Sequence, residues 1–217
     1  MTADTRRRLF WLSLLAIAMA QLEAAVVVYL RKVYYPDGFE FPLVIIRDRI
    51  AAIEIGREAA TVVMLFALAK LYSARDRWRQ YAAFLWAFGI WDIFYYVWLW
   101  IMLRWPSSLL DWDVLFLIPL PWVGPVLAPV LIAVVMMAAG WAILLLRDAD
   151  RAVAVKKADW VVTVGCAVAL IALFAADAGS VLEGRMPHPF RWPLFALFLI
   201  PPMFVAARAF QRSRECR

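Results

Sequence analysis

The sequence is poor in the residues that build metal, redox and disulfide sites. It contains two cysteines, Cys166 and Cys216, and one histidine, His188. Two cysteines without a CxxC pair exclude a disulfide framework and a thioredoxin-type redox site. A single histidine does not supply the ligand set of a zinc or haem site. We therefore predict no such metal site, and the sequence identifies no cofactor.

Several motifs of soluble enzymes are also missing. The chain has no GxSxG, no HExxH and no glycine-rich phosphate loop, and it contains only eight glycines. Nucleophile elbows, zinc protease helices and nucleotide-binding loops are therefore excluded. The net charge is +6, but the basic residues are dispersed between apolar runs and form no patch. This distribution argues against a nucleic-acid partner.

What the chain does contain is apolar and aromatic. Hydrophobic residues make up 66% of it, and its mean hydropathy is +0.75. Soluble domains are roughly 45–50% apolar. The 12 Trp, 7 Tyr and 14 Phe are typical of a protein that crosses two membrane–water interfaces. We predict an integral protein of the cell (inner or plasma) membrane, with the lipid bilayer as its first partner.

Six segments are long and apolar enough to cross a bilayer, which requires about 20 residues each. The sequence therefore predicts one all-α domain over residues 1–217, a polytopic transmembrane bundle of six spans. Hydropathy supports the second span least, because it includes three charged residues. The predicted spans are residues 9–30, 51–72, 81–103, 123–146, 158–176 and 192–210.

The distribution of lysine and arginine predicts the orientation of these spans. With the N-terminus in the cytoplasm, fifteen of the 23 basic residues lie on the cytoplasmic side and seven on the outer side, and Arg57 lies within the bilayer. Cytoplasmic loops of membrane proteins are enriched in lysine and arginine. We therefore expect both termini in the cytoplasm.

The segment before the fourth span is unusual. Residues 114–146 carry no charge, and one helix of that length would measure about 50 Å, too long for a hydrocarbon core of about 30 Å. The prolines at 119, 121, 125 and 129 indicate where it is interrupted. We expect a short interfacial or re-entrant helix at about 108–119, with Ser107 or Ser108 as its cap. The alternative is an ordinary outer loop with a proline-rich entry to the fourth span.

Ionisable residues inside the predicted spans are the main functional signal. They are costly in a membrane and normally face a partner or a wet cavity. On the second span, Glu54, Arg57 and Glu58 share one helical face. The first span contributes Glu23 and the third contributes Asp92, one turn after Gly89, whose missing side chain would let another helix approach closely. We predict that these groups line a polar cavity that opens to the outer side.

The chemistry of this set suggests a cationic ligand. If all were ionised, the four acids and Arg57 would sum to −3, so either an acid is protonated or a cation is bound. Asp92 and Tyr96 lie on one stripe of an aromatic helix, an arrangement suited to ion pairing and cation–π contact. The predicted ligand-binding residues are Glu23, Glu54, Arg57, Glu58, Asp92 and Tyr96.

Three functions fit the sequence. The first is a small membrane protein that binds or translocates a proton, a cation or a small cationic or lipid ligand in this outward-facing pocket. The second is a non-catalytic subunit of a larger membrane complex, with partner membrane subunits and with buried charges that serve packing. The third is an intramembrane enzyme that acts on a lipid or an isoprenoid, although no catalytic residue can be named and we lean against an enzyme.

Overall fold

A computed structural model describes residues 1–34, 49–118 and 120–215 of the chain. A helix overlaps most of each of the six predicted spans. They are α1 (Ala3–Tyr34), α2 (Arg49–Tyr72), α3 (Arg77–Leu103), α4 (Leu127–Asp148), α5 (Lys157–Ala175) and α7 (Trp192–Glu215), and a short α6 (Ala178–Leu182) follows α5. Within the described ranges, five helices are long and apolar enough to cross a membrane, and α2 is not among them. The structure thus supports an integral membrane protein.

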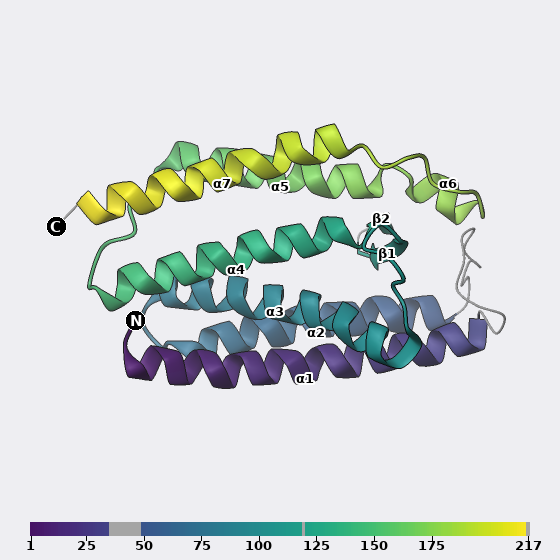
Figure 1. The fold of residues 1–217 in the computed structure, drawn as a ribbon, viewed down its shortest axis with the longest axis horizontal. Coiled ribbons are helices and arrows are strands. Elements are labelled where there is room, and N and C mark those ends of the chain that lie inside the picture. Colours follow the sequence, from purple (N-terminus) through teal and green to yellow (C-terminus); the bar gives the residue numbers. More distant parts are fainter. Residues whose placement is uncertain (35–48, 119, 216–217) are drawn as a thin grey trace.

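The helices run side by side along the long axis of the molecule, and both termini lie at the same end (Figure 1). Helix α3 is central, because it packs against α1, α2 and α4. Helices α5 and α7 pack on each other and form a separate layer beyond α4 (Figure 1). We call the end that carries the termini the terminal end. We call the opposite end the hairpin end, because it carries a two-stranded hairpin within residues 112–125.

The predicted helix at about 108–119 is wrong. The described part of this segment contains β1 (Trp112–Phe116), which pairs in antiparallel register with β2 (Trp122–Pro125), so the fold is not purely helical. Strand β2 also occupies the predicted start of the fourth span, and α4 begins only at Leu127. Aromatic and β-branched residues favour a strand here, and Pro121 cannot donate the hydrogen bond that a continuing helix needs.

The serines before this hairpin do not cap a helix either. The Asp111 carboxylate accepts hydrogen bonds from the backbone N–H groups of Ser107 (2.7 Å) and Ser108 (3.2 Å) and from the Ser107 hydroxyl (2.9 Å). Such local side-chain bonds compete with helix formation. The result is a tight turn, from which the chain enters β1.

The contact between α3 and α4 depends on two glycines. A Cβ atom added to Gly89 would lie 2.7 Å from the carbonyl oxygen of Ala133, and one added to Gly140 would lie 2.7 Å from that of Ala82. Gly89 therefore permits the close helix approach that the sequence predicted, and Gly140 adds a second point of backbone contact. Small residues at helix interfaces are the usual basis of tight packing in membranes.

Polar groups fix the helix ends at the terminal end. Asp76 caps α3 through the backbone N–H of Trp78 (2.9 Å) and accepts a hydrogen bond from Arg147 (2.8 Å) at the end of α4. Partial burial raises the pKa of the Asp76 carboxyl, but these hydrogen bonds outweigh that effect and hold the pKa below its ordinary value. Asp148 accepts hydrogen bonds from Thr5 (2.7 Å) and Arg79 (2.8 Å), which connects the start of α1 to α3 and α4.

The close approach of α3 and α4 predicts that Gly140→Ala destabilises the protein by about 1–3 kcal/mol, because the new methyl group meets backbone atoms that cannot move aside. Gly165→Ala on α5 is the matched control, since a Cβ atom there meets nothing within 4 Å. Thermal unfolding in detergent should show a lower Tm for the first variant alone. Equal Tm values for Gly140→Ala and the unmodified protein would contradict this account of the interface.

Candidate functional site

The polar residues of α2 form a buried stripe on a helix whose other faces are exposed. Glu54 is 6% exposed, Glu58 7% and Thr61 2%, whereas Ile53 is 65% exposed and Val63 64%. A soluble helix would show the opposite arrangement. This inversion gives the ionisable groups polar partners inside the protein and leaves apolar faces outward, an arrangement typical of a helix that faces lipid.

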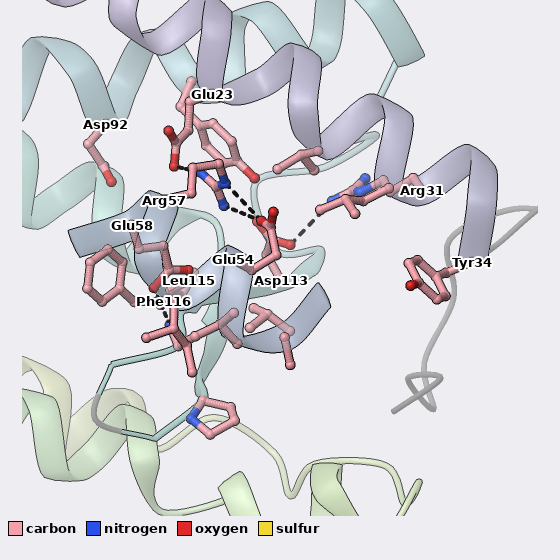
Figure 2. Close-up of a pocket in the computed structure, with 18 of the residues that line it drawn as sticks. Glu23, Arg31, Tyr34, Glu54, Arg57, Glu58, Asp92, Asp113, Leu115 and Phe116 are labelled. Carbon is pink, nitrogen blue, oxygen red and sulfur yellow. Dashed lines mark hydrogen bonds and ion pairs between the residues drawn. The ribbon is translucent and has the colours of Figure 1, made fainter. Parts of the chain in front are cut away.

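Arg57 is the organising cation of this stripe. Its guanidinium group pairs with Glu54, at 2.8 Å from Nε and 2.7 Å from Nη2 to the same oxygen, and also pairs with Glu23 of α1. The second oxygen of Glu23 accepts a hydrogen bond from the Thr61 hydroxyl at 3.0 Å. These contacts join α1 to α2 (Figure 2). The planar fork of arginine suits such double recognition of carboxylates.

Glu58 points to the hairpin instead of to Arg57. Its carboxylate accepts a hydrogen bond from the backbone N–H of Leu117, directly after β1, at 2.9 Å. An extended segment that leaves its strand has unpaired backbone groups, and burial without a partner would be costly. Glu58 therefore provides the hydrogen-bond acceptor for a backbone N–H group at the point where the hairpin passes α2.

A second ion pair attaches the hairpin to α1. Arg31 donates to Asp113 of β1 at 3.3 Å, and its guanidinium group also lies 3.7 Å from the centre of the Trp105 ring. Arg31 is 7% exposed and Asp113 is 3% exposed. Burial raises the pKa of the Asp113 carboxyl to about 6, against the opposing effect of Arg31.

Asp92 differs from the other acids. It lies on α3, and its carboxylate points toward the side on which Arg57 and Glu58 lie (Figure 2). Its Oδ2 atom is buried and has no hydrogen-bond partner among the residues that the structure describes. Buried polar atoms of this kind are rare and call for an explanation, such as a bound water, ion or ligand.

All six predicted site residues line one cavity of about 410 Å³, which we call the acidic cavity. The sequence predicted walls from three helices, and the structure adds the hairpin and the edge of α6. Apolar and aromatic side chains make up much of the wall. They include Val27, Ile55, Trp91, Tyr95 and Phe116.

The charges of the acidic cavity do not balance. Among the described residues, five acids line it together with two arginines, so full ionisation of these groups leaves three negative charges. Arg57 is shared between Glu23 and Glu54, and Arg31 is paired with Asp113. Within the part of the chain that the structure describes, Glu58 has a backbone hydrogen-bond partner and no ion pair, and Asp92 forms no ion pair. Either protonation of an acid or a bound cation would offset this negative charge.

The arrangement does not resemble a metal centre. Within residues 1–34, 49–118 and 120–215, no group of three histidine, cysteine, aspartate or glutamate side chains could hold a metal ion. His188 lies in a loop outside the acidic cavity, where it pairs with Asp177 at 2.6 Å. The acids of the cavity thus either pair with an arginine or stand apart from the other acids.

Sequence reasoning missed Arg31 and Asp113 as members of the site. Arg31 follows the predicted first span of residues 9–30, yet Glu23, Val27 and Arg31 follow each other at helical spacing and line the same cavity. Extending the predicted first helix to Tyr34 would have placed Arg31 on the same face as Glu23. Asp113 lies within the segment predicted as a helix at about 108–119, and its buried orientation depends on strand alternation that a helix does not have.

Comparisons with protein-family models, with curated proteins and with solved structures give no match.

The Arg57 network predicts strong coupling between its members. Arg57→Met should lower the free energy of unfolding by about 3–5 kcal/mol, because it leaves two carboxylates buried without a cation. In a Glu23→Gln, Glu54→Gln background the same substitution should cost much less. Chemical or thermal unfolding in detergent measures both steps.

The exposed pair Glu183 and Arg185 provides the control, since both side chains are at least 64% exposed. Its removal by Glu183→Gln and Arg185→Met should leave stability unchanged. An equal cost of Arg57→Met in both backgrounds would show that the three residues are not a unit.

Proposed function

We propose that the protein crosses the membrane six times with both termini in the cytoplasm, and that the acidic cavity binds a small organic cation from the opposite side. In this proposal α2 also crosses the membrane, in addition to the five helices that are long and apolar enough by themselves. Its charged stripe is buried against α1 and the hairpin, so that its exposed faces are apolar. Its 24 residues would extend about 36 Å, enough to cross a hydrocarbon core of about 30 Å.

The observation that carries the ligand proposal is the buried Oδ2 atom of Asp92, which has no hydrogen-bond partner among the described residues. Trp91, Tyr95 and Tyr96 line the cavity beside it on α3. A carboxylate can bind the charge of an amine or quaternary ammonium group while aromatic rings contact its flanks. The apolar wall residues then suit a hydrocarbon body attached to that charge.

An organic cation fits better than a metal ion. A hard metal cation requires several oxygen ligands that converge on one point, and the described acids do not converge in this way. An organic cation needs one carboxylate and a contact surface. A volume of about 410 Å³ lies within the range of about 300–1,000 Å³ that is usual for small-molecule pockets.

A purely structural role explains the Arg57 network but not Asp92. Glu23 and Glu54 are paired with Arg57, and their contacts are of the kind that specifies helix packing. Asp92 contributes no ion pair to that packing. If burial of charge served only to lock the helices, a carboxylate without a partner at this position would cost stability for no gain.

Binding can be tested with benzyltrimethylammonium, which carries a permanent charge on an aromatic body. Isothermal titration in detergent should detect binding to the unmodified protein, and Asp92→Asn should weaken it at least tenfold, because the ion pair is lost. The neutral isostere 2,2-dimethylpropylbenzene (neopentylbenzene) should bind much more weakly. Asp150→Asn is the control, since Asp150 is exposed and lies outside the acidic cavity.

Equal affinity of the unmodified protein and Asp92→Asn for the cation would overturn this proposal. Equal affinity for the cation and its neutral isostere would show that the cavity selects apolar shape and not charge. A normal Tm of Asp92→Asn keeps either result from being attributed to misfolding.

The topology is tested separately by cysteine labelling in intact cells. In a Cys166→Ser, Cys216→Ser background, Leu110→Cys at the hairpin end should react with a membrane-impermeant maleimide. Asp150→Cys at the terminal end should react only after the cells are permeabilised. The reverse pattern would place the termini outside and the acidic cavity on the cytoplasmic side.

A further inference from the structure

A second cavity lies between the two helix layers, toward the terminal end. Its volume is about 300 Å³, and residues of α3, α4, α5 and α7 form its walls. We call it the interlayer crevice. Its walls are almost entirely apolar, with Ile132, Met136 and Ala139 on one side and Leu170, Val205 and Ala206 on the other.

The packing of the helices explains why this space exists. Helix α4 packs closely against α3 and more lightly against α7, while α5 packs mainly on α7 (Figure 1). The crevice follows α4 from Ile132 to Leu146, a rise of about 21 Å. That length exceeds the depth of one bilayer leaflet, which is about 15 Å of hydrocarbon. An extended acyl chain matches this shape, and its dispersion contacts would replace those that an empty crevice lacks.

The terminal end of the crevice is aromatic. Trp78 at the start of α3 and Trp160 at the start of α5 lie stacked across it, with ring centres 6.3 Å apart, and Tyr81 contacts both rings. Tryptophan and tyrosine prefer the level of the lipid headgroups. This cluster therefore marks the depth at which an acyl chain in the crevice would join its headgroup.

Basic residues surround this aromatic rim. Lys156 and Lys157 adjoin Val155, which lines the crevice, and Arg77 adjoins Trp78. All three are exposed, and none forms an ion pair with a described residue. The acid at the rim, Asp159, is already paired with Arg212. The rim thus presents uncompensated positive charge to a headgroup.

We propose that the interlayer crevice binds an anionic phospholipid, with one acyl chain between the layers and its phosphate near Lys156 and Lys157. Charge complementarity selects a headgroup with net negative charge over a zwitterionic one. The proposed topology places this rim at the cytoplasmic leaflet, but lipid binding does not depend on the acidic cavity. Failure of cation binding there would leave this inference untouched.

Native mass spectrometry of protein taken from mixed bilayers of phosphatidylglycerol and phosphatidylcholine tests the proposal. We expect the unmodified protein to retain phosphatidylglycerol at least fivefold over its share in the bilayer. Lys156→Ser with Lys157→Ser should abolish this selectivity, and Ala139→Phe should reduce the retained lipid by filling the crevice.

Each variant has a matched control on the same protein. Arg6→Ser with Arg75→Ser removes two exposed basic residues away from the crevice, and Ala138→Phe adds a ring to an exposed neighbour of Ala139. Both controls should retain phosphatidylglycerol as the unmodified protein does. Thermal unfolding confirms that Ala139→Phe is folded, and Ala139→Leu serves as a milder filling variant if it is not.

Three results would overturn the proposal. Equal retention of the two lipids would show that the crevice holds no selective site. Loss of selectivity in the Arg6 and Arg75 control would assign it to general surface charge. Unchanged retention in Ala139→Phe or Ala139→Leu, with a normal Tm, would show that the headgroup adsorbs to the rim without a chain in the crevice.

Discussion

The position of Arg57 is the constraint on which the rest of the hairpin end depends. A guanidinium group cannot be left unpaired in a membrane interior, because the cost of its desolvation is large. Its two carboxylate partners come from different helices, and Thr61 fixes the second oxygen of Glu23. This set determines the rotation of α1 and α2 about their axes. The same rotation directs Glu58 to the hairpin and Arg31 to Asp113.

The hairpin is the second consequence of burying polar groups. Buried backbone groups outside helices need hydrogen-bond partners, because an unpaired buried N–H or C=O group is costly. Here the backbone groups of β1 and β2 pair with each other. The Asp111 carboxylate accepts hydrogen bonds from the turn before them, and the Glu58 carboxylate accepts one from the N–H of Leu117. The acidic cavity and the hairpin therefore belong to one arrangement, because the carboxylate that stabilises the hairpin also contributes to the negative charge of the cavity.

The sequence was sufficient for the features that depend on periodicity and composition. The six apolar segments become helices, and the spacing of Glu54, Arg57 and Glu58 places them on one buried face. It was insufficient where the outcome depends on long-range pairing. The strands at 112–116 and 122–125 pair with each other, and the hydrogen bonds of Asp111 that precede them do not follow from helical capping rules. The roles of Arg31 and Asp113 depend on a contact between residues 82 positions apart.

The inverted polarity of α2 has a consequence for how the chain enters the membrane during synthesis. A helix released alone into lipid would carry Glu54, Arg57 and Glu58 together, and each charged residue near a helix centre costs about 3 kcal/mol on insertion scales. Glu23 and Arg57 neutralise each other only when α1 is already present. If α2 spans the membrane as proposed, α1, which precedes it along the chain, supplies Glu23 as a partner for Arg57 and so lowers the cost of placing α2 in lipid.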